Sequence, residues 1–234
     1  MSLSLPTIAA IETSTELASV AVLCGDRLTS RESSGAQTHS MTVLALLQEL
    51  LREQDMALGQ CNALAFGSGP GSFTGVRTAC GLAQGLAFGA NLPVVPVVTL
   101  LAMADAARNQ GAGDNIIAVL DARMGEVYWA QYRFHEQWQI VSEPRLSAPE
   151  QVIAEDASCA AGNGLAVYAD RFTGLQPVRR WPELMPHASQ IALLGREFAQ
   201  QGQGVHAREA QPLYLRNKVA LTTAERTAAN GAGA

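Results

Sequence analysis

The sequence predicts an α/β protein with two similar halves, each built from a mixed sheet with flanking helices. One observation is the order of its elements: three strands, a helix, a strand, a glycine-containing turn and a helix occur twice. The other is size, because 234 residues that are 48% hydrophobic can bury one or two substantial cores. We therefore expect a first domain over residues 1–101, a second over 102–219 and a flexible tail at 220–234.

The first half begins with three expected strands, at residues 7–12, 17–24 and 27–33. Gly25-Asp26 is a two-residue hairpin signal, and the polar composition of the third strand is typical of a sheet edge. Next we expect a helix over 39–54, a buried strand at 63–66, a glycine-rich loop, a helix over 76–88 and a strand at 94–98.

The second half repeats this order after a helix at 102–108. We expect strands at 116–121, 126–134 and 137–141, a short helix at 149–155, a strand at 159–161, a turn at 162–164 and a helix over 165–171. A last helix over 187–201 and the segment 211–217 should pack back on the core. The repeated order is similar to that of the actin and hexokinase superfamily (ASKHA fold), in which two like domains flank a nucleotide cleft.

The loop at residues 67–75 joins a strand to a helix, which is the layout of an anion cradle. It is not a Walker A loop, because no lysine is near it, and its glycine spacing is not that of a dinucleotide fingerprint. Ser72 follows Gly71 directly, so the spacing of a nucleophile elbow is also missing.

The two helices of the first half have more apolar or small residues than one buried face needs. In the helix over 39–54, the apolar side chains cover an arc of roughly 160° around the helix axis, whereas the apolar stripe of an ordinary surface helix covers about 100°. In the next helix Gly81, Gly85 and Gly89 recur every four residues, each interior one at a cost of about 1 kcal/mol. Another backbone should approach there, either from the same domain or from a partner. We therefore expect these residues to bind a partner: Val43, Leu46, Leu47, Leu50, Arg77, Gly81 and Gly85.

The net charge of −5 and the single lysine, Lys218, argue against a protein that grips nucleic acid unaided. The basic cluster Arg179-Arg180-Trp181 is the best local candidate for RNA contact, but a solvated turn is the more common role of such a cluster. Four widely spaced cysteines form no metal-type pair, and no signal peptide or membrane span is evident. We expect a cytoplasmic protein that is not bound to a membrane.

The run from Phe66 to Phe88, centred on Gly-Pro-Gly-Ser-Phe-Thr-Gly-Val-Arg at residues 69–77, resembles the TsaB (YeaZ) family. This family belongs to bacterial threonylcarbamoyladenosine tRNA modification. Further matching motifs span nearly the whole chain: Thr13-Ser14-Thr15, His39-Ser40, residues 121–129 and Tyr214-Leu215-Arg216-Asn217.

The resemblance implies a noncatalytic subunit without a cofactor. It would bind the TsaD transferase through the two apolar helices and work with TsaE, an ATPase. Together they would support threonylcarbamoyl transfer to N6 of the adenosine 3′ to the anticodon in tRNAs reading codons that begin with A. In isolation the subunit would form a homodimer, and tRNA would be bound only through the complex.

The superfamily cleft is expected to be degenerate. Glu12 and Asp121 end the first strands of the two halves, where a magnesium-linked carboxylate would be placed. However, Thr13 and Ser14 replace the glycine that lets a phosphate approach, and Arg123 crowds the second turn.

The resemblance also bears on metal binding and on catalysis. Thr99 and Met103 stand where the related transferase has two metal-binding histidines, so we expect no metal. We assign no catalytic residue. The alternatives are a nucleotide-dependent enzyme of the actin/hexokinase fold, a glycoprotease-like hydrolase, or a homodimer whose helices pair only with themselves.

Overall fold

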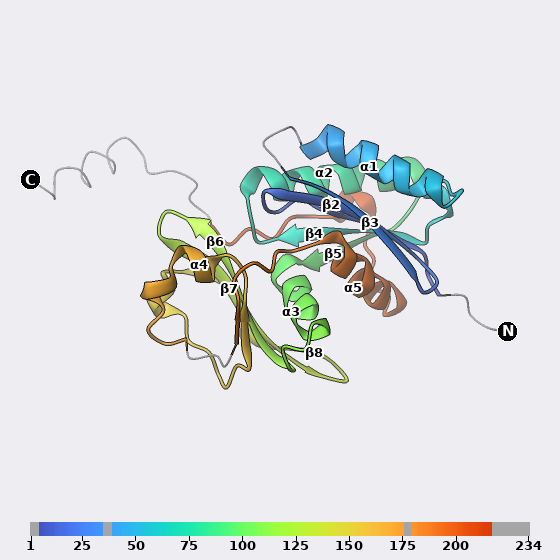
Figure 1. Cartoon of the computed structure of the whole chain (residues 1–234). Helices are drawn as coiled ribbons and strands as arrows, with labels where there is room; N and C mark the ends of the chain where they lie inside the picture. Colours follow the sequence, from blue (N-terminus) through green and yellow to red (C-terminus); the bar gives the residue numbers. More distant parts are fainter. Residues whose placement is uncertain (1–4, 35–38, 176–178, 217–234) are drawn as a thin grey trace, which may run out of the picture.

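The computed structural model of the chain describes residues 5–34, 39–175 and 179–216, and it has two five-stranded sheets (Figure 1). The first sheet has the order β3-β2-β1-β4-β5. Its strands are β1 (Ile8–Glu12), β2 (Leu17–Cys24), β3 (Arg27–Ser34), β4 (Ala63–Gly69) and β5 (Val94–Val98). Because β1 is antiparallel to β2 and parallel to β4, the sheet is mixed, as predicted.

Helices cover both faces of this sheet. On one face lie α1 (His39–Glu53) and α2 (Phe73–Ala90), and on the other lie α3 (Thr99–Asn109) and α5 (Ala188–Gln200) (Figure 1). Both faces of the sheet are apolar because successive side chains of β4 point to opposite faces. Leu64 and Phe66 join the core beneath α1 and α2, while Ala65 joins the core on the other face. A Cβ on Gly195 of α5 would lie only 2.6 Å from the Ala65 Cβ, so glycine permits the close approach of α5 to β4.

The second sheet has the order β10-β9-β6-β7-β8. Its strands are β6 (Asn115–Arg123), β7 (Glu126–His135), β8 (Gln137–Ser147), β9 (Cys159–Ala161) and β10 (Arg179–Trp181). Residues Ile116, Ala118 and Leu120 of β6 share one core with α3, α5 and the first sheet. The two halves are therefore joined by a continuous apolar core.

Three local predictions for the second half are wrong. The expected helix at 149–155 is only a 3-10 turn, Pro149–Gln151, and the expected helix at 165–171 is the four-residue α4 (Gly164–Val167) with a 3-10 turn, Ala169–Arg171. Tyr168 leaves the helical region, and its hydroxyl donates to Asp121. The cluster at 179–181 is β10 rather than a turn, because it pairs in parallel with β9.

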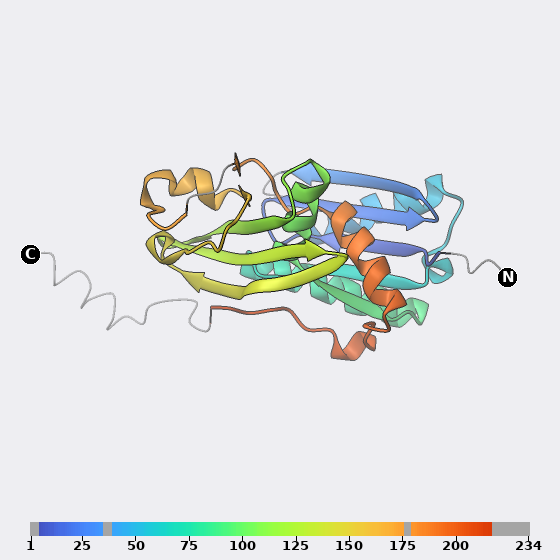
Figure 2. The same ribbon diagram turned by 90° about the horizontal axis from the view of Figure 1, so that it is seen from below.

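The C-terminal part of the described chain returns to the first half. Helix α5 crosses the strands of the first sheet (Figure 2), although the expected boundary places it in the second domain. The 3-10 turn Ala207–Glu209 packs on α2, and Val205 forms a β-bridge with Val94. Apolar residues of α5, among them Ile191 and Leu194, join the core beneath β1 and β4, which fixes this position. The expected flexible tail lies outside the described residues.

Within the described ranges, no helix is both long enough and apolar enough to cross a lipid bilayer.

Candidate functional site

The inner side of α1 is buried within the subunit. Val43, Leu47 and Leu50, expected at a partner surface, lie in the same core as β2 and α2, and Leu46 packs partly against that core. Most of the wide apolar arc is covered by the sheet, by α2 and by the segment around Met56 and Leu58, whereas Leu44 is half-buried and lines a groove of about 600 Å³. Val43, Leu47 and Leu50 therefore do not contribute to the outer surface of the subunit.

The glycine stripe of α2 faces outward. Gly81, Gly85 and Gly89 are exposed, and apart from the adjacent residues and the backbone of α2 itself, a Cβ added to any of them would have no atom of the described residues within 4 Å. Among the described residues, packing within the same domain, one of the two interpretations of this stripe, is therefore wrong. The opposite side of α2 carries the buried residues Ala79, Ala83 and Ala87.

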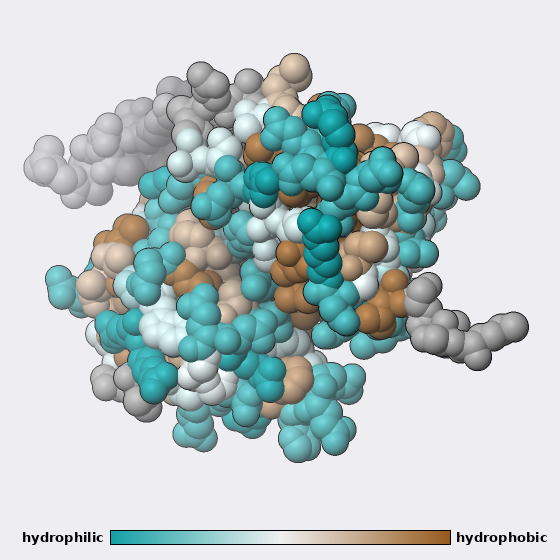
Figure 3. Space-filling view, turned by 45° about the vertical axis from the view of Figure 1, so that its right-hand side comes forward, coloured by the Kyte–Doolittle hydropathy of each residue, from teal (hydrophilic) through white to brown (hydrophobic). Residues whose placement is uncertain are grey.

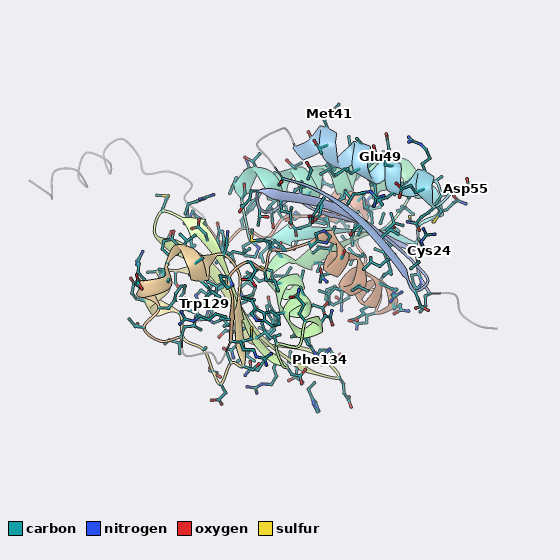
Figure 4. The ribbon with its side chains drawn as sticks, in the orientation of Figure 1. Cys24, Met41, Glu49, Asp55, Trp129 and Phe134 are labelled. Carbon is teal, nitrogen blue, oxygen red and sulfur yellow. The ribbon has the colours of Figure 1, made fainter. Side chains whose placement is uncertain are left out.

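Large exposed apolar side chains occur on the same two helices. Phe88 on α2 is 59% exposed and Met41 on α1 is 72% exposed. Figure 4 shows Met41 and Glu49 on the outer side of α1, away from the sheet. The view in Figure 3 shows hydrophobic residues as separate patches on a largely hydrophilic face. We call the outer surface around Met41, Gly81, Gly85 and Phe88 the α1–α2 face.

Arg77 begins an aromatic stack at the N-terminal end of α2. Its guanidinium lies 4.0 Å from the Phe73 ring centroid, and its Nε donates to the Tyr214 hydroxyl at 3.0 Å. The rings of Phe73 and Tyr214 are stacked, with centroids 4.8 Å apart. Tyr214, from one of the motifs matched in the sequence, thus fastens the C-terminal segment to α2.

The glycine-rich loop packs against the chain's own backbone. A Cβ on Gly71 or Gly75 would overlap the carbonyl groups of Ser14 and Thr13, respectively. The Ser72 N–H donates to the Ser14 carbonyl at 2.7 Å, while the Ser72 side chain caps α2. The first hairpin therefore occupies the place that an anion would take in a cradle of this layout.

Glu12 is sealed beneath this loop. Its side chain is fully buried, a Cβ on Gly67 would overlap its carboxyl group, and Ser14 N–H and the Thr99 hydroxyl donate to it. Burial raises the pKa of Glu12, and the hydrogen bonds from Ser14 and Thr99 only partly oppose this. A sealed carboxyl with a raised pKa does not fit the role of a magnesium-linked carboxylate.

A cleft of about 400 Å³ lies between the two halves. It brings together three of the residues predicted for it, Ser14, Asp121 and Arg123, whereas Glu12 and Thr13 lie behind its wall. Asp121 Oδ1 accepts hydrogen bonds from the Tyr168 hydroxyl and the Arg123 N–H, both at 2.8 Å. Its side chain is thereby held by its own chain, and the cleft residues do not fit a metal-bound nucleotide.

Sequence reasoning missed several residues of the cleft: Phe73, Tyr128, Asn163 and Arg216 also line it. Arg216 pairs with Glu126 through its Nη2. Arg216 lies in a motif that the resemblance had marked, and Asn163 lies in the predicted glycine turn. Only the return of the C-terminal segment to the β6–β7 hairpin brings Arg216 to the cleft.

Thr99 and Met103, which stand where the related transferase has metal-binding histidines, lie in the core. Thr99 is buried and accepts a hydrogen bond from Gly69 N–H at 3.2 Å. Met103 is also buried, and its Cε lies where Gly162 leaves room for it. No cluster of three or more His, Cys, Asp or Glu side chains suited to a metal occurs in the described part of the chain.

Comparisons with known proteins agree with this arrangement. The family model "TsaD: tRNA N6-adenosine threonylcarbamoyltransferase" matches residues 32–220. Two proteins named "tRNA threonylcarbamoyladenosine biosynthesis protein TsaB" each match 91% of the chain. The one from Haemophilus influenzae is 39% identical with 94% of its own length covered, and the one from Escherichia coli is 36% identical with 96% covered.

Solved structures match equally well. A Pseudomonas aeruginosa structure described as similar to peptidase YEAZ has a TM-score of 0.86 at 36% identity, covering 91% of this chain and all of its own. A second, described as YeaZ from the same organism, has a TM-score of 0.85 at 36% identity over 90% of this chain and all of its own. The predicted actin/hexokinase-like fold is confirmed. The chain belongs to the TsaB (YeaZ) family of tRNA threonylcarbamoyladenosine biosynthesis proteins.

Proposed function

We propose that this chain is a noncatalytic subunit that binds a TsaD-like transferase through the α1–α2 face. It supports threonylcarbamoyl transfer to N6 of the adenosine 3′ to the anticodon in tRNAs that read codons beginning with A. A TsaE-like ATPase joins the assembly, and tRNA binds only through the complex. In isolation the same face pairs two copies of the chain, and the setting is the cytoplasm.

The exposed glycine stripe of α2 carries this proposal. Each interior glycine costs an α-helix about 1 kcal/mol relative to alanine. Gly81 and Gly85 have no positive φ and contact no atom that a Cβ would displace, so nothing within the described chain requires glycine there. A helix from another chain, packed closely against this stripe, gives both glycines a reason to be present.

The cleft supports the noncatalytic part of the proposal. Glu12 is sealed, the first hairpin lies against the N-terminus of α2, and Asp121 is engaged by Tyr168 and Arg123. A kinase of this fold needs an open phosphate hairpin and a free carboxylate in the same place. We therefore retain the cleft as a degenerate nucleotide site and disfavour the enzyme alternatives.

The decisive experiment is Gly85→Arg. Because the position opens to solvent in the subunit, the variant should fold with a melting temperature at or above that of the wild type. Its free energy of binding to a TsaD-like transferase should nevertheless weaken by several kcal/mol, because a long charged side chain would stand in a closely packed interface.

The matched control is Ala166→Arg, a small-to-large change at an exposed position of α4 in the second half. It should bind the transferase as the wild type does. A folded Gly85→Arg protein that still binds normally would refute the assigned face. Sedimentation of the same variants without the transferase tests the homodimer separately.

A further inference from the structure

The glycine stripe of α2 lies between two arginines. Arg77, Gly81 and Gly85 recur every four residues, so they lie on one side of the helix. Phe88 follows Gly85 by three residues and lies on the same side. Arg208, from the 3-10 turn that packs on α2, holds its guanidinium 5.3 Å from the Phe88 ring centroid. One cation therefore stands at each end of the stripe.

Both guanidiniums are held by aromatic rings and not by carboxylates. Arg77 lies over Phe73 and donates to the Tyr214 hydroxyl, and Arg208 lies near the Phe88 ring. Within the described ranges, neither arginine forms an ion pair. Other arginines of the chain do pair with Asp or Glu: Arg31, Arg108, Arg123, Arg171 and Arg216. The charges of Arg77 and Arg208 thus remain available to a carboxylate from another chain.

The surface beside the stripe offers no negative charge of its own. A groove of about 400 Å³ lies between Gly85 and Phe88 of α2 and Arg208. The acidic neighbour of Arg208, Glu209, does not border this groove. Helix α2 contains no Asp or Glu, and Arg77 is its one charged residue. The stripe is therefore cationic at both ends and uncharged between them.

We infer that the segment that packs on the glycine stripe is an acidic helix, with one carboxylate for Arg77 and another for Arg208. This inference rests on the proposed function, because the helix is assigned to the TsaD-like transferase. Arg77 and Phe88 are separated by about 16 Å along the axis of α2. The two carboxylates are therefore spaced by about three helical turns, and the uncharged part of the partner helix lies on Gly81 and Gly85.

The same two arginines oppose pairing with a second copy of the chain. A two-fold pair centred on the stripe sets α2 against the same helix of the other copy. That copy brings two further arginines to the stripe and no carboxylate on its own α2. Like charges placed opposite one another cost binding free energy. Arg77 and Arg208 thereby direct the α1–α2 face toward the transferase and away from self-association.

Salt dependence distinguishes the two complexes. Raising the ionic strength from about 0.01 to 1 M shortens the Debye length from about 30 to 3 Å. The affinity for the transferase should fall over this range, because attraction between opposite charges is screened. The affinity of the homodimer should rise, because repulsion between arginines is screened. Sedimentation velocity of the full chain, alone and mixed with the transferase, measures both affinities.

The double variant Arg77→Gln/Arg208→Gln removes both charges, and its glutamine at position 77 can still donate to the Tyr214 hydroxyl. At low salt it should bind the transferase about three- to tenfold more weakly than the wild type and should self-associate more tightly. Both affinities should also depend less on salt.

Two further variants guard against indirect effects. Arg208→Gln alone leaves the contacts of Arg77 intact and should weaken transferase binding by about two- to threefold. Arg133→Gln is the matched control, because it makes the same change of charge at an exposed position of β7 in the second half. It should bind the transferase and itself as the wild type does.

The charge assignment is overturned by any of three results. One is an unchanged transferase affinity in both Arg208→Gln and the double variant. Another is a double variant in which both complexes weaken together. The third is a wild-type affinity for the transferase that does not fall with salt. If Gly85→Arg still abolishes transferase binding in these cases, the proposed face stands and only its charge selection fails. Normal binding by Gly85→Arg refutes the face itself.

Discussion

The Thr13 hydroxyl donates a hydrogen bond to the carbonyl oxygen of Gly75 at 2.7 Å, so the first hairpin and the first turn of α2 are in direct contact. The same two residues approach so closely that a Cβ on Gly75 would overlap the Thr13 carbonyl. This contact closes the hairpin over the helix N-terminus, where related layouts bind anions. Gly75 therefore faces inward, against the hairpin, whereas Gly81 and Gly85 of the same helix face outward.

Alanine substitutions should therefore have opposite effects at two positions of the same helix. Gly75→Ala should lower the free energy of unfolding by about 2 kcal/mol or more, because the hairpin or α2 must shift. Gly81→Ala should raise it by up to about 1 kcal/mol, since the position is open and alanine favours the helix. Urea unfolding of the isolated protein measures both. Equal effects of the two substitutions would contradict the orientation of α2.

Glu12→Gln should change how stability depends on pH. Because burial raises the folded-state pKa of Glu12, the native state holds its proton above the unfolded value of about 4.3. The stability that this group contributes is full below that value and is lost as the pH rises through the folded pKa. The amide that replaces the carboxyl group can still accept from Ser14 N–H and can donate to Thr99, so the variant should lack this loss.

Chemical unfolding at a series of pH values from 4 upward checks this expectation for Glu12. The difference in unfolding free energy between Glu12→Gln and the wild type should grow in favour of the variant as the pH rises. Glu12→Ala is the control, because it leaves Ser14 N–H unpaired and should cost about 1–3 kcal/mol. Parallel pH profiles for the wild type and Glu12→Gln would show that Glu12 is not a buried neutral acid.

Tyr214→Ala should release the C-terminal segment from α2. The substitution removes the stack on Phe73 and the hydrogen bond from Arg77 Nε, together worth about 1–2 kcal/mol. The Leu213 amide, which donates to the Ser68 carbonyl at 2.7 Å, should then exchange its hydrogen faster. Tyr214→Phe keeps the stack and should have a much smaller effect. Unchanged exchange in Tyr214→Ala would mean that other contacts hold the segment.

The isolated protein should bind tRNA only weakly at physiological salt. Its net charge is −5 and it has a single lysine, so few phosphates can be neutralised. A filter-binding titration should show a clear rise in affinity only when the transferase subunit is added. Micromolar or tighter binding by the lone subunit would contradict this prediction.

The sequence by itself determined the elements whose signals are local. Strands β2 and β5 begin and end where predicted: the hairpin signal Gly25-Asp26 follows the end of β2, and Pro93 precedes the start of β5. The repeated order of elements and the motifs around residues 69–77 were sufficient for the fold and the family. These features depend on neighbours in the chain, so no tertiary contact was needed to predict them.

Only the tertiary structure decided which side of each helix is used within the subunit. Val43, Leu47 and Leu50 resemble Leu46 in sequence, yet the sheet buries the first three more completely. Gly75 and Gly81 are both helix glycines, but the first hairpin reaches only Gly75. Likewise α5 lies on the first sheet, and Arg216 reaches the cleft, through contacts between residues far apart in the chain. Local patterns do not specify such contacts, because they record what a segment can bury and not which segment will cover it.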